Sequence, residues 1–148
     1  ASVQNGVRET PHQALASKGG TRLLYIDDDE SMVLLVVRLL ERRKYVVSGF
    51  SDATAAIEKL RGDPSGFDVV LSDYNMPYLS GLDVARAVRD IRADLPVAIV
   101  SGFIDERLLA QAKDAGVREL IVKTVDVTEF CESVQRLAES VSRDSKAP

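Results

Sequence analysis

Short apolar runs alternate along this chain with longer segments in which apolar residues recur every three or four positions. A short continuous apolar run is typical of a strand buried on both faces, whereas the longer spacing predicts an amphipathic helix. The runs predicted as strands are 23–26, 46–50, 67–71, 97–100 and 120–122. The segments predicted as helices are 32–40, 53–60, 82–91, 108–115 and 127–141.

This order of elements predicts an α/β fold with a doubly wound, five-stranded parallel sheet and five helices. Right-handed crossovers between parallel strands cover both faces of such a sheet with helices. The carboxyl ends of the strands then meet at one edge, where ligands bind in folds of this kind. We expect residues 21–141 to form the domain. The polar segments 1–20 and 142–148 are predicted to be a flexible linker or tail and a C-terminal tail.

Polar residues follow four of the five predicted strands. They are Asp27, Asp28 and Asp29 after the first strand, Asp73 after the third, Ser101 after the fourth and Lys123 after the fifth. Carboxylates brought together at one edge repel each other until one is protonated or a cation neutralises them, and oxygen ligands suit Mg²⁺. A carboxylate beside Mg²⁺, a hydroxyl and an ammonium group is the set that phosphoryl transfer to Asp requires.

Each of these residues also has an ordinary structural explanation. Asp29 and Glu30 suit the start of a helix, where acidic side chains cap free N–H groups and interact favourably with the helix dipole. Ser101 before Gly102 is common in turns, and Lys123 taken alone is an ordinary solvated charge. The coincidence of these residues at one edge of the sheet, rather than any one of them, favours a chemical site.

The composition excludes several other classes of site. A single cysteine, Cys131, rules out an internal disulfide and a multi-cysteine zinc site, and a single histidine, His12, argues against a Ser-His-Asp triad. The net charge is −4 and the basic residues are scattered, so this chain is not expected to bind nucleic acid. No apolar run approaches the ~20 residues that span a bilayer. No signal peptide is recognisable, so we expect a cytoplasmic location without membrane contact.

Four stretches of this sequence resemble the receiver domain of two-component response regulators. They are residues 23–30 (LLYIDDDE), 69–77 (VVLSDYNMP), 98–102 (AIVSG) and 120–123 (LIVK). The second stretch is the specific one, and the resemblance extends over about residues 21–141. It implies the flavodoxin-like receiver fold and a role as phosphoacceptor in a two-component phosphorelay.

The resemblance implies that Asp73 takes a phosphoryl group from a phosphohistidine of a histidine kinase or a histidine phosphotransfer protein. Ser101 is then expected to contact a phosphoryl oxygen and to move on phosphorylation. Lys123 is expected to pair with the phosphoryl group and with Asp73. A domain of this kind switches conformation to signal and catalyses at most its own dephosphorylation.

The resemblance also implies a Mg²⁺ site formed by Asp27, Asp28, Asp73 and the backbone carbonyl of Asn75. Asp28 and Asp73 are expected as direct ligands. Three aspartates in a row leave the register open, and we assign the first two because they directly follow the strand, as in the family pattern.

Two positions depart from the family. Thr124 follows Lys123 where the family usually has proline, often after a cis bond. A cis bond before a residue other than proline costs about 3–4 kcal/mol, so we expect either a trans bond or a strained one. Leu120 stands where the family often has a rotating Tyr or Phe. Acceptance of phosphate should survive both changes, whereas its coupling to an output surface is in question.

The wider context allows two interpretations. The polar segment 1–20 and the stretch 100–103 (VSGF) look like the C-terminal receiver of a hybrid sensor histidine kinase, and a free-standing regulator is the other interpretation. Whether the chain is itself an enzyme depends on that choice, and a weak homodimer stays open.

Three other functions compete with the phosphoacceptor hypothesis. A phosphatase of the haloacid dehalogenase type would use Asp27 as nucleophile in a D-x-D pattern, although Ser31 replaces its usual Thr or Val. A flavodoxin-like cofactor binder needs a phosphate-binding loop rich in Gly, Ser or Thr after the first strand, where this chain has four acids. A degenerate receiver that only docks partners would not need Asp73, Ser101 and Lys123.

Overall fold

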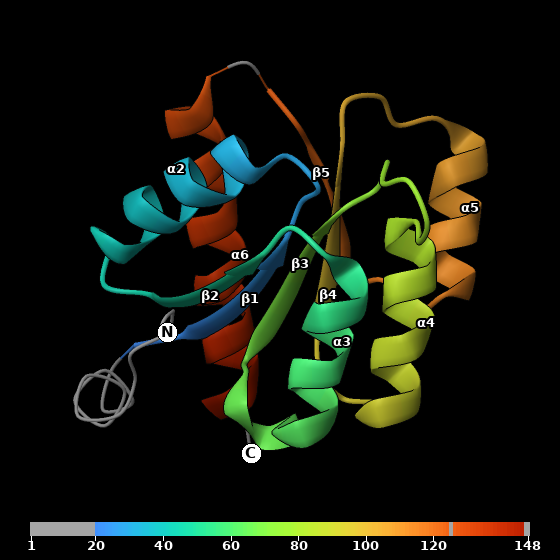
Figure 1. The fold of residues 1–148 in the computed structure, drawn as a ribbon, viewed down its shortest axis with the longest axis horizontal. Coiled ribbons are helices and arrows are strands. Elements are labelled where there is room, and N and C mark those ends of the chain that lie inside the picture. The colour runs from blue at the N-terminus through green and yellow to red at the C-terminus, as the bar shows by residue number, and fades with distance from the viewer. Residues whose placement is uncertain (1–19, 125, 147–148) are drawn as a thin grey trace.

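Residues 20–124 and 126–146 are described by a computed structural model, in which helices cover both faces of a parallel sheet (Figure 1). The strands are β1 (Arg22–Ile26), β2 (Val46–Phe50), β3 (Val69–Asp73), β4 (Val97–Ser101) and β5 (Glu119–Val122). Their order across the sheet is β2-β1-β3-β4-β5, and every neighbouring pair is parallel. The predicted doubly wound five-stranded α/β fold is confirmed.

The helices form two layers around the sheet. They are α2 (Glu30–Glu41), α3 (Ala53–Gly62), α4 (Gly81–Ile91), α5 (Glu106–Asp114) and α6 (Val127–Lys146), with a short 3₁₀ turn, η1, at Pro64–Gly66. Helices α2 and α6 lie on one face, and α3, α4 and α5 lie on the other (Figure 1). None of the helices in the described part of the chain is both long and apolar enough to span a membrane.

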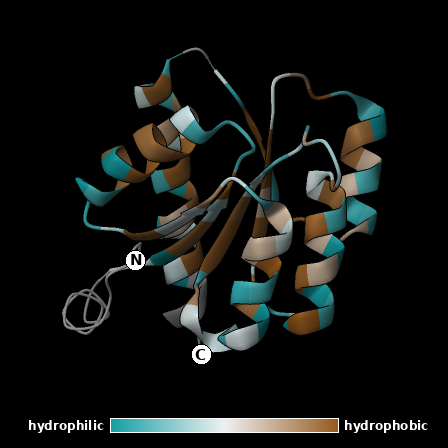
Figure 2. Cartoon of the chain, viewed as in Figure 1, coloured by the Kyte–Doolittle hydropathy of each residue, from teal (hydrophilic) through white to brown (hydrophobic). Residues whose placement is uncertain are grey.

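Alternate residues of each strand enter different cores because side chains of a strand point to opposite faces. Leu24 and Ile26 of β1 pack with α3, α4 and α5, whereas Leu23 and Tyr25 pack with α2 and α6. The central strands are therefore apolar on both sides, and the helices carry their hydrophobic residues on the side facing the sheet (Figure 2). This explains why the strands read as continuous apolar runs.

The third strand differs from its predicted bounds. It was expected at 67–71 and is found at Val69–Asp73, so Ser72 and Asp73 belong to the strand and do not follow it. The apolar pattern misplaces this end because a polar side chain does not stop backbone pairing. Asp73 is still paired with Val100 of β4, and the N–H of Tyr74 donates to the Val100 carbonyl at 2.8 Å.

The last helix extends beyond its predicted end. Helix α6 continues to Lys146, into the segment 142–148 that the sequence assigned to a tail. Each added helical residue gains a backbone hydrogen bond, so polar residues can continue a helix past its apolar stripe. The segment predicted as a linker, 1–20, lies outside the described residues except for residue 20.

Candidate functional site

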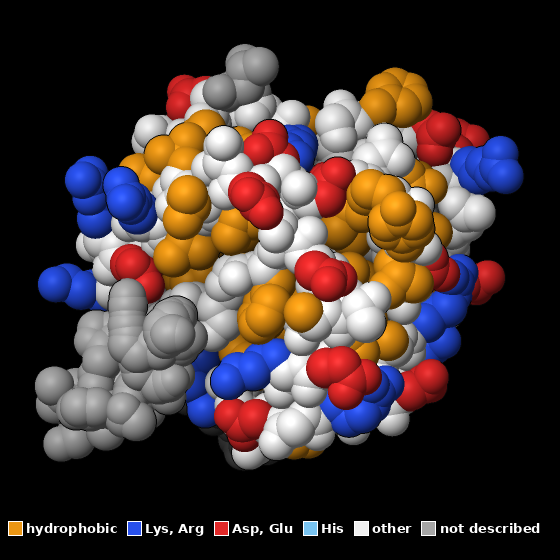
Figure 3. Space-filling view, viewed as in Figure 1, with side chains coloured by type: hydrophobic (Ala, Val, Ile, Leu, Met, Phe, Trp, Pro, Cys, Tyr) orange, Lys and Arg blue, Asp and Glu red, His pale blue; other side chains and the backbone are white. Residues whose placement is uncertain are grey.

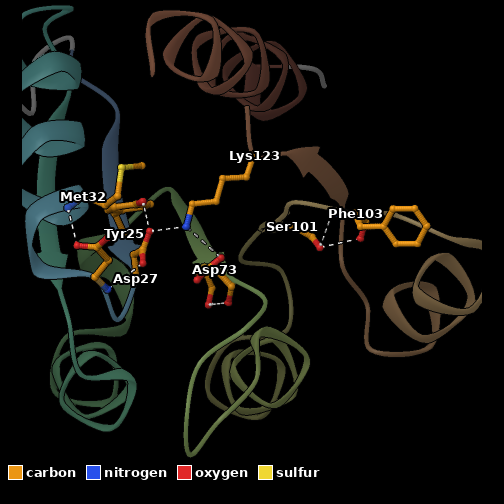
Figure 4. A network of polar contacts seen from close by, with 9 residues as sticks. Tyr25, Asp27, Met32, Asp73, Ser101, Phe103 and Lys123 are labelled. Carbon is orange, nitrogen blue, oxygen red and sulfur yellow. Dashed lines mark hydrogen bonds and ion pairs between the residues drawn. The ribbon is translucent and has the colours of Figure 1, made fainter. Parts of the chain in front are cut away.

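Four of the residues predicted to form a site come together at the carboxyl edge of the sheet. Asp27 and Asp28 follow β1, Asp73 ends β3, and Lys123 follows β5. Figure 4 shows the Lys123 side chain between Asp27 and Asp73. One carboxylate oxygen of each aspartate lies within 4.8 Å of the other two. Asp27 and Asp73 are buried, whereas Asp28 is exposed to solvent. The site is thus a small acidic cluster with one side open to water.

Asp27 is held by three donors. The Tyr25 hydroxyl donates to Asp27 Oδ2 at 2.9 Å, and Lys123 Nζ donates to the same oxygen at 3.1 Å. The backbone N–H of Asp29 donates to Asp27 Oδ1 at 3.0 Å. Because Asp27 is only 1% exposed, these protein groups take the place of water around its charge.

Asp29 lies outside the cluster and caps a helix. Its side chain accepts from the N–H groups of Ser31 and Met32 at the start of α2, and Glu30 occupies the first turn. This is the ordinary structural role that the sequence left open for Asp29 and Glu30. Of the three consecutive aspartates, Asp27 and Asp28 thus lie in the acidic cluster and Asp29 does not.

Close packing of α4 positions Asp73. A Cβ atom on Gly81 would lie 2.8 Å from the Asp73 carbonyl oxygen and 3.1 Å from the Tyr74 Cα, distances that real Cβ atoms rarely reach. The N–H of Gly81 donates to the Tyr74 carbonyl at 3.0 Å. Glycine at this position lets the start of α4 approach the end of β3, which fixes the backbone that carries the Asp73 side chain.

The surroundings of Asp73 disfavour its charged form. Burial, with the negative charges of Asp27 and Asp28, raises the pKa of Asp73 to about 6, although Lys123 opposes the shift from 3.5 Å away. The pKa of Lys123 is raised above its ordinary value. Burial favours the neutral amine, but the hydrogen bonds and negative charges of Asp27 and then of Asp73 outweigh the effect of burial. The cluster therefore has more negative charge than Lys123 can balance.

Replacing Asp73 with Asn is expected to stabilise the metal-free protein at neutral pH. Because the pKa of Asp73 is raised from 3.8 to about 6, the folded state keeps a proton through this window that the unfolded state loses. Stability therefore falls as pH rises from about 4 to about 6. Asp73→Asn should raise the free energy of unfolding by about 1–3 kcal/mol at pH 8 and by well under 1 kcal/mol at pH 4. Urea denaturation in EDTA measures both values, and an equal gain at the two pH values would contradict the raised pKa.

Ser101 has its hydroxyl engaged away from the acidic cluster. It donates to the Phe103 carbonyl at 2.8 Å and accepts from the Phe103 N–H at 3.3 Å, an arrangement typical of a serine turn (Figure 4). The carbonyl of Ser101 accepts from the Lys123 N–H at 2.8 Å, which ties the ends of β4 and β5 together. A hydroxyl has a single hydrogen, so to donate to a group on Asp73 the Ser101 hydroxyl would have to leave the Phe103 carbonyl.

The remaining predicted positions lie around the cluster. Asn75 is exposed on the loop after β3. Leu120 is partly buried and packs against the core formed with α3, α4 and α5. No peptide bond between described residues is cis, so Lys123 precedes Thr124 through a trans bond, one of the two expected outcomes.

Sequence reasoning missed one polar contact of the site. Tyr25 was counted only as part of an apolar strand, yet its hydroxyl reaches Asp27 while its ring packs near Phe130, with ring centroids 6.4 Å apart. Burial, aided by the charge of Asp27 and the hydrogen bond to it, raises the pKa of the Tyr25 hydroxyl far above its usual range. The signal was present in the spacing, because residues two apart on a strand share a face.

The donor set suits a hard divalent cation. Three carboxylates with an exposed member offer oxygen ligands and excess negative charge, and these match the preference of Mg²⁺ for a few carboxylates with water on the remaining positions. Figure 3 shows acidic side chains near the top of this face of the molecule, with hydrophobic side chains on both sides. The exposed hydrophobic residues on the nearby loops include Tyr78, after β3, and Phe103, after β4.

Comparisons with known proteins agree on one family. The family model described as the response regulator receiver domain matches residues 23–135. The chain is 31% identical over 127 residues to the two-component response regulator ARR10 of Arabidopsis thaliana, an alignment that covers 86% of this chain. It spans only 22% of the length of ARR10 and 18% of that of the related ARR12.

Two bacterial response regulator structures share this fold. A response regulator receiver domain protein from Clostridium thermocellum has a TM-score of 0.73 and 26% identity, covering 84% of this chain and 97% of that one. The response regulator TrrA from Thermotoga maritima, solved in complex with Mg²⁺-BeF, has a TM-score of 0.67 and 25% identity. That alignment covers 79% of this chain and 98% of TrrA.

Proposed function

This chain belongs to the response regulator receiver domain family, and we propose that Asp73 is its phosphoacceptor. Receiver domains of two-component systems take phosphoryl groups from histidine kinases or histidine phosphotransfer proteins. The observation that supports the assignment is the position of Asp73 at the end of β3, beside Asp27, Asp28 and the ammonium group of Lys123.

The proposed reaction is transfer of a phosphoryl group from a phosphohistidine to a carboxylate. An Asp73 oxygen attacks phosphorus, and the new O–P bond forms as the N–P bond of the donor breaks. The electron pair of that bond returns to the imidazole nitrogen, which takes a proton from solvent. Asp73 must be ionised to attack, and at neutral pH a carboxyl group with a pKa of about 6 is mostly ionised.

Asp28, Asp73 and the backbone carbonyl of Asn75 would hold Mg²⁺, with Asp27 next to them. The bound ion would offset negative charge on the oxygens of the transferring group. One Asp27 oxygen accepts hydrogen bonds from Tyr25 and Lys123, and the other accepts one from the Asp29 N–H. The orientation of the Asp27 carboxylate is therefore fixed before any ion binds.

Two further residues complete the proposed site. Lys123 Nζ lies 3.5 Å from Asp73 Oδ1, close enough to pair with a phosphoryl oxygen carried by that side chain. We assign Ser101 to a second phosphoryl oxygen, which requires its hydroxyl to leave the Phe103 carbonyl. Loss of that contact would then report phosphorylation to the loop after β4.

The haloacid dehalogenase alternative has no support in these comparisons. The geometry also disfavours it, because Asp27 is 1% exposed and both of its carboxylate oxygens already accept hydrogen bonds. A nucleophile needs an open approach to phosphorus, and Asp73 is better placed for that than Asp27.

Mapping of the labelled residue tests the assignment. The protein is incubated with acetyl phosphate and Mg²⁺, the acyl phosphate is reduced with borohydride, and the modified peptide is identified by mass spectrometry. We expect the reduced residue at position 73. A label at Asp27 would instead support a phosphatase-type nucleophile, and a label at neither position would reject both functions.

The stretch 100–103 bears on the kind of protein that contains this domain. We infer that the domain receives its phosphoryl group within a hybrid sensor histidine kinase in the cytoplasm, because the stretch 100–103 resembles such receivers. The exposed Tyr78 and Phe103 beside the site offer apolar contacts suited to a protein donor. The test compares the rate of phosphoryl transfer to Asp73 from a purified phosphorylated kinase core with the rate from a phosphotransfer protein. Faster transfer from the kinase core is expected for a receiver of a hybrid kinase.

A further inference from the structure

Tyr25 and Lys123 donate to the same carboxylate oxygen. The Tyr25 hydroxyl lies 2.9 Å and Lys123 Nζ 3.1 Å from Asp27 Oδ2 (Figure 4). The Asp29 N–H donates to the other oxygen, Asp27 Oδ1. Tyr25 and Asp27 are each 1% exposed. While Lys123 is in place this oxygen is therefore shielded from solvent, and its protein donors replace hydrogen bonds to water.

The ammonium group of Lys123 lies between two carboxylates. It lies 3.1 Å from Asp27 Oδ2 and 3.5 Å from Asp73 Oδ1, so in this structure it is closer to Asp27. A phosphoryl group on Asp73 would bring new anionic oxygens to the second side. A lysine that turns toward them withdraws its positive charge from Asp27, and Asp27 Oδ2 then keeps only the Tyr25 hydroxyl as a donor.

We propose that Tyr25 is a positioning residue for phosphoryl transfer: its hydroxyl holds Asp27 Oδ2 so that Lys123 is free to leave for the phosphoryl group on Asp73. This inference rests on the proposed phosphoacceptor function. Tyr25 does not contact the reacting atoms and acts only through Asp27 and Lys123. Its ring is enclosed in the core beside Phe130, so the hydroxyl stays on Asp27 when Lys123 moves.

A double-mutant cycle tests the proposal. The rate of labelling by acetyl phosphate at saturating Mg²⁺ is measured for the wild type, Tyr25→Phe, Lys123→Ala and the double variant. Tyr25→Phe is expected to slow labelling about tenfold, which corresponds to about 1.4 kcal/mol. In the Lys123→Ala background the same change should slow it by less than about twofold, because no lysine remains to be released.

A second measurement separates positioning from a general defect of the site. Without a phosphodonor, Lys123 stays on Asp27, so the affinity for Mg²⁺ measured by calorimetry should differ by less than about twofold between Tyr25→Phe and the wild type. A damaged Asp27 geometry would weaken Mg²⁺ binding and labelling together. Beryllofluoride binding in the presence of Mg²⁺ gives the same four-variant comparison if Lys123→Ala is labelled too slowly to measure.

Tyr45→Phe is the matched control. Tyr45 is a half-buried tyrosine packed against the same core as Tyr25. The charged side chains that act on its hydroxyl are Glu139 and Arg43, not those of the acidic cluster. It should be labelled at the wild-type rate. An unchanged rate for Tyr25→Phe, or an equal loss in both Lys123 backgrounds, would overturn the role of Tyr25. A wild type that is not labelled at Asp73 would reject the phosphoacceptor function itself.

Discussion

Asp73→Asn should abolish labelling of this protein by small phosphodonors. The amide of asparagine carries no negative charge and forms no acyl phosphate, so the nucleophile is lost while the shape of the side chain is kept. We expect incorporation from acetyl phosphate, followed by intact mass spectrometry in the presence of Mg²⁺, to fall by at least about 100-fold. Circular dichroism should show an unchanged fold, in agreement with the stability gain expected at neutral pH.

The control for this variant is another aspartate at the same edge of the sheet. Asp105 follows β4, is exposed and caps α5 through a hydrogen bond from the Leu108 N–H. Asparagine caps a helix about as well as aspartate, so Asp105→Asn should be labelled within about twofold of the wild-type rate. Full incorporation into Asp73→Asn would place the acceptor at another residue and defeat the assignment.

Removal of Mg²⁺ should have an effect of similar size. Three carboxylate oxygens lie within 4.8 Å of one another, and among the described residues a single lysine contacts them, which leaves a negative site that repels an incoming phosphoryl group. Labelling by acetyl phosphate in excess EDTA is expected to fall by at least about 100-fold and to return when Mg²⁺ is added in excess. Labelling that continues undiminished in EDTA would show that the acidic cluster does not need a cation.

Two neighbouring aspartates, Asp28 and Asp29, allow a matched test of Mg²⁺ ligation. Asp28 belongs to the cluster, whereas Asp29, the next residue, caps α2. Asp28→Asn should therefore raise the Mg²⁺ concentration for half-maximal labelling by about tenfold or more, and Asp29→Asn should change it by less than about twofold. Equal effects of the two changes would mean that net charge, rather than direct ligation, controls the response.

The apolar pattern predicted the layers of this fold because burial of a strand on both faces leaves no room for polar residues. The apolar pattern was less reliable at the ends of helices and strands, because backbone hydrogen bonds determine where each element stops. Asp73 continues the pairing of β3 with β4, and α6 continues to Lys146 past its apolar stripe. For the candidate site this matters directly, since Asp73 belongs to the strand itself and is held by its backbone.

The site could be predicted only as a set of residue types. Strand ends of a parallel sheet meet at one edge, so the convergence of acids and a lysine followed from the order of the elements. Three consecutive aspartates left open which of them join the acidic cluster, and only the family pattern favoured the first two. Nor could the sequence show that the Ser101 hydroxyl is bonded to Phe103. Both depend on where loops turn, which is a matter of local backbone geometry.

By itself, the sequence determined the order of strands and helices, the edge at which the chemistry gathers, and the chemical types present there. Periodicity and parallel topology are encoded along the chain, so they can be recognised without coordinates. Only the tertiary structure decided that Lys123 lies nearer to Asp27 than to Asp73 and that Tyr25 shares its oxygen. These choices depend on differences of a few tenths of an ångström between side chains at the ends of β1, β3 and β5, and such differences arise only when the core has packed.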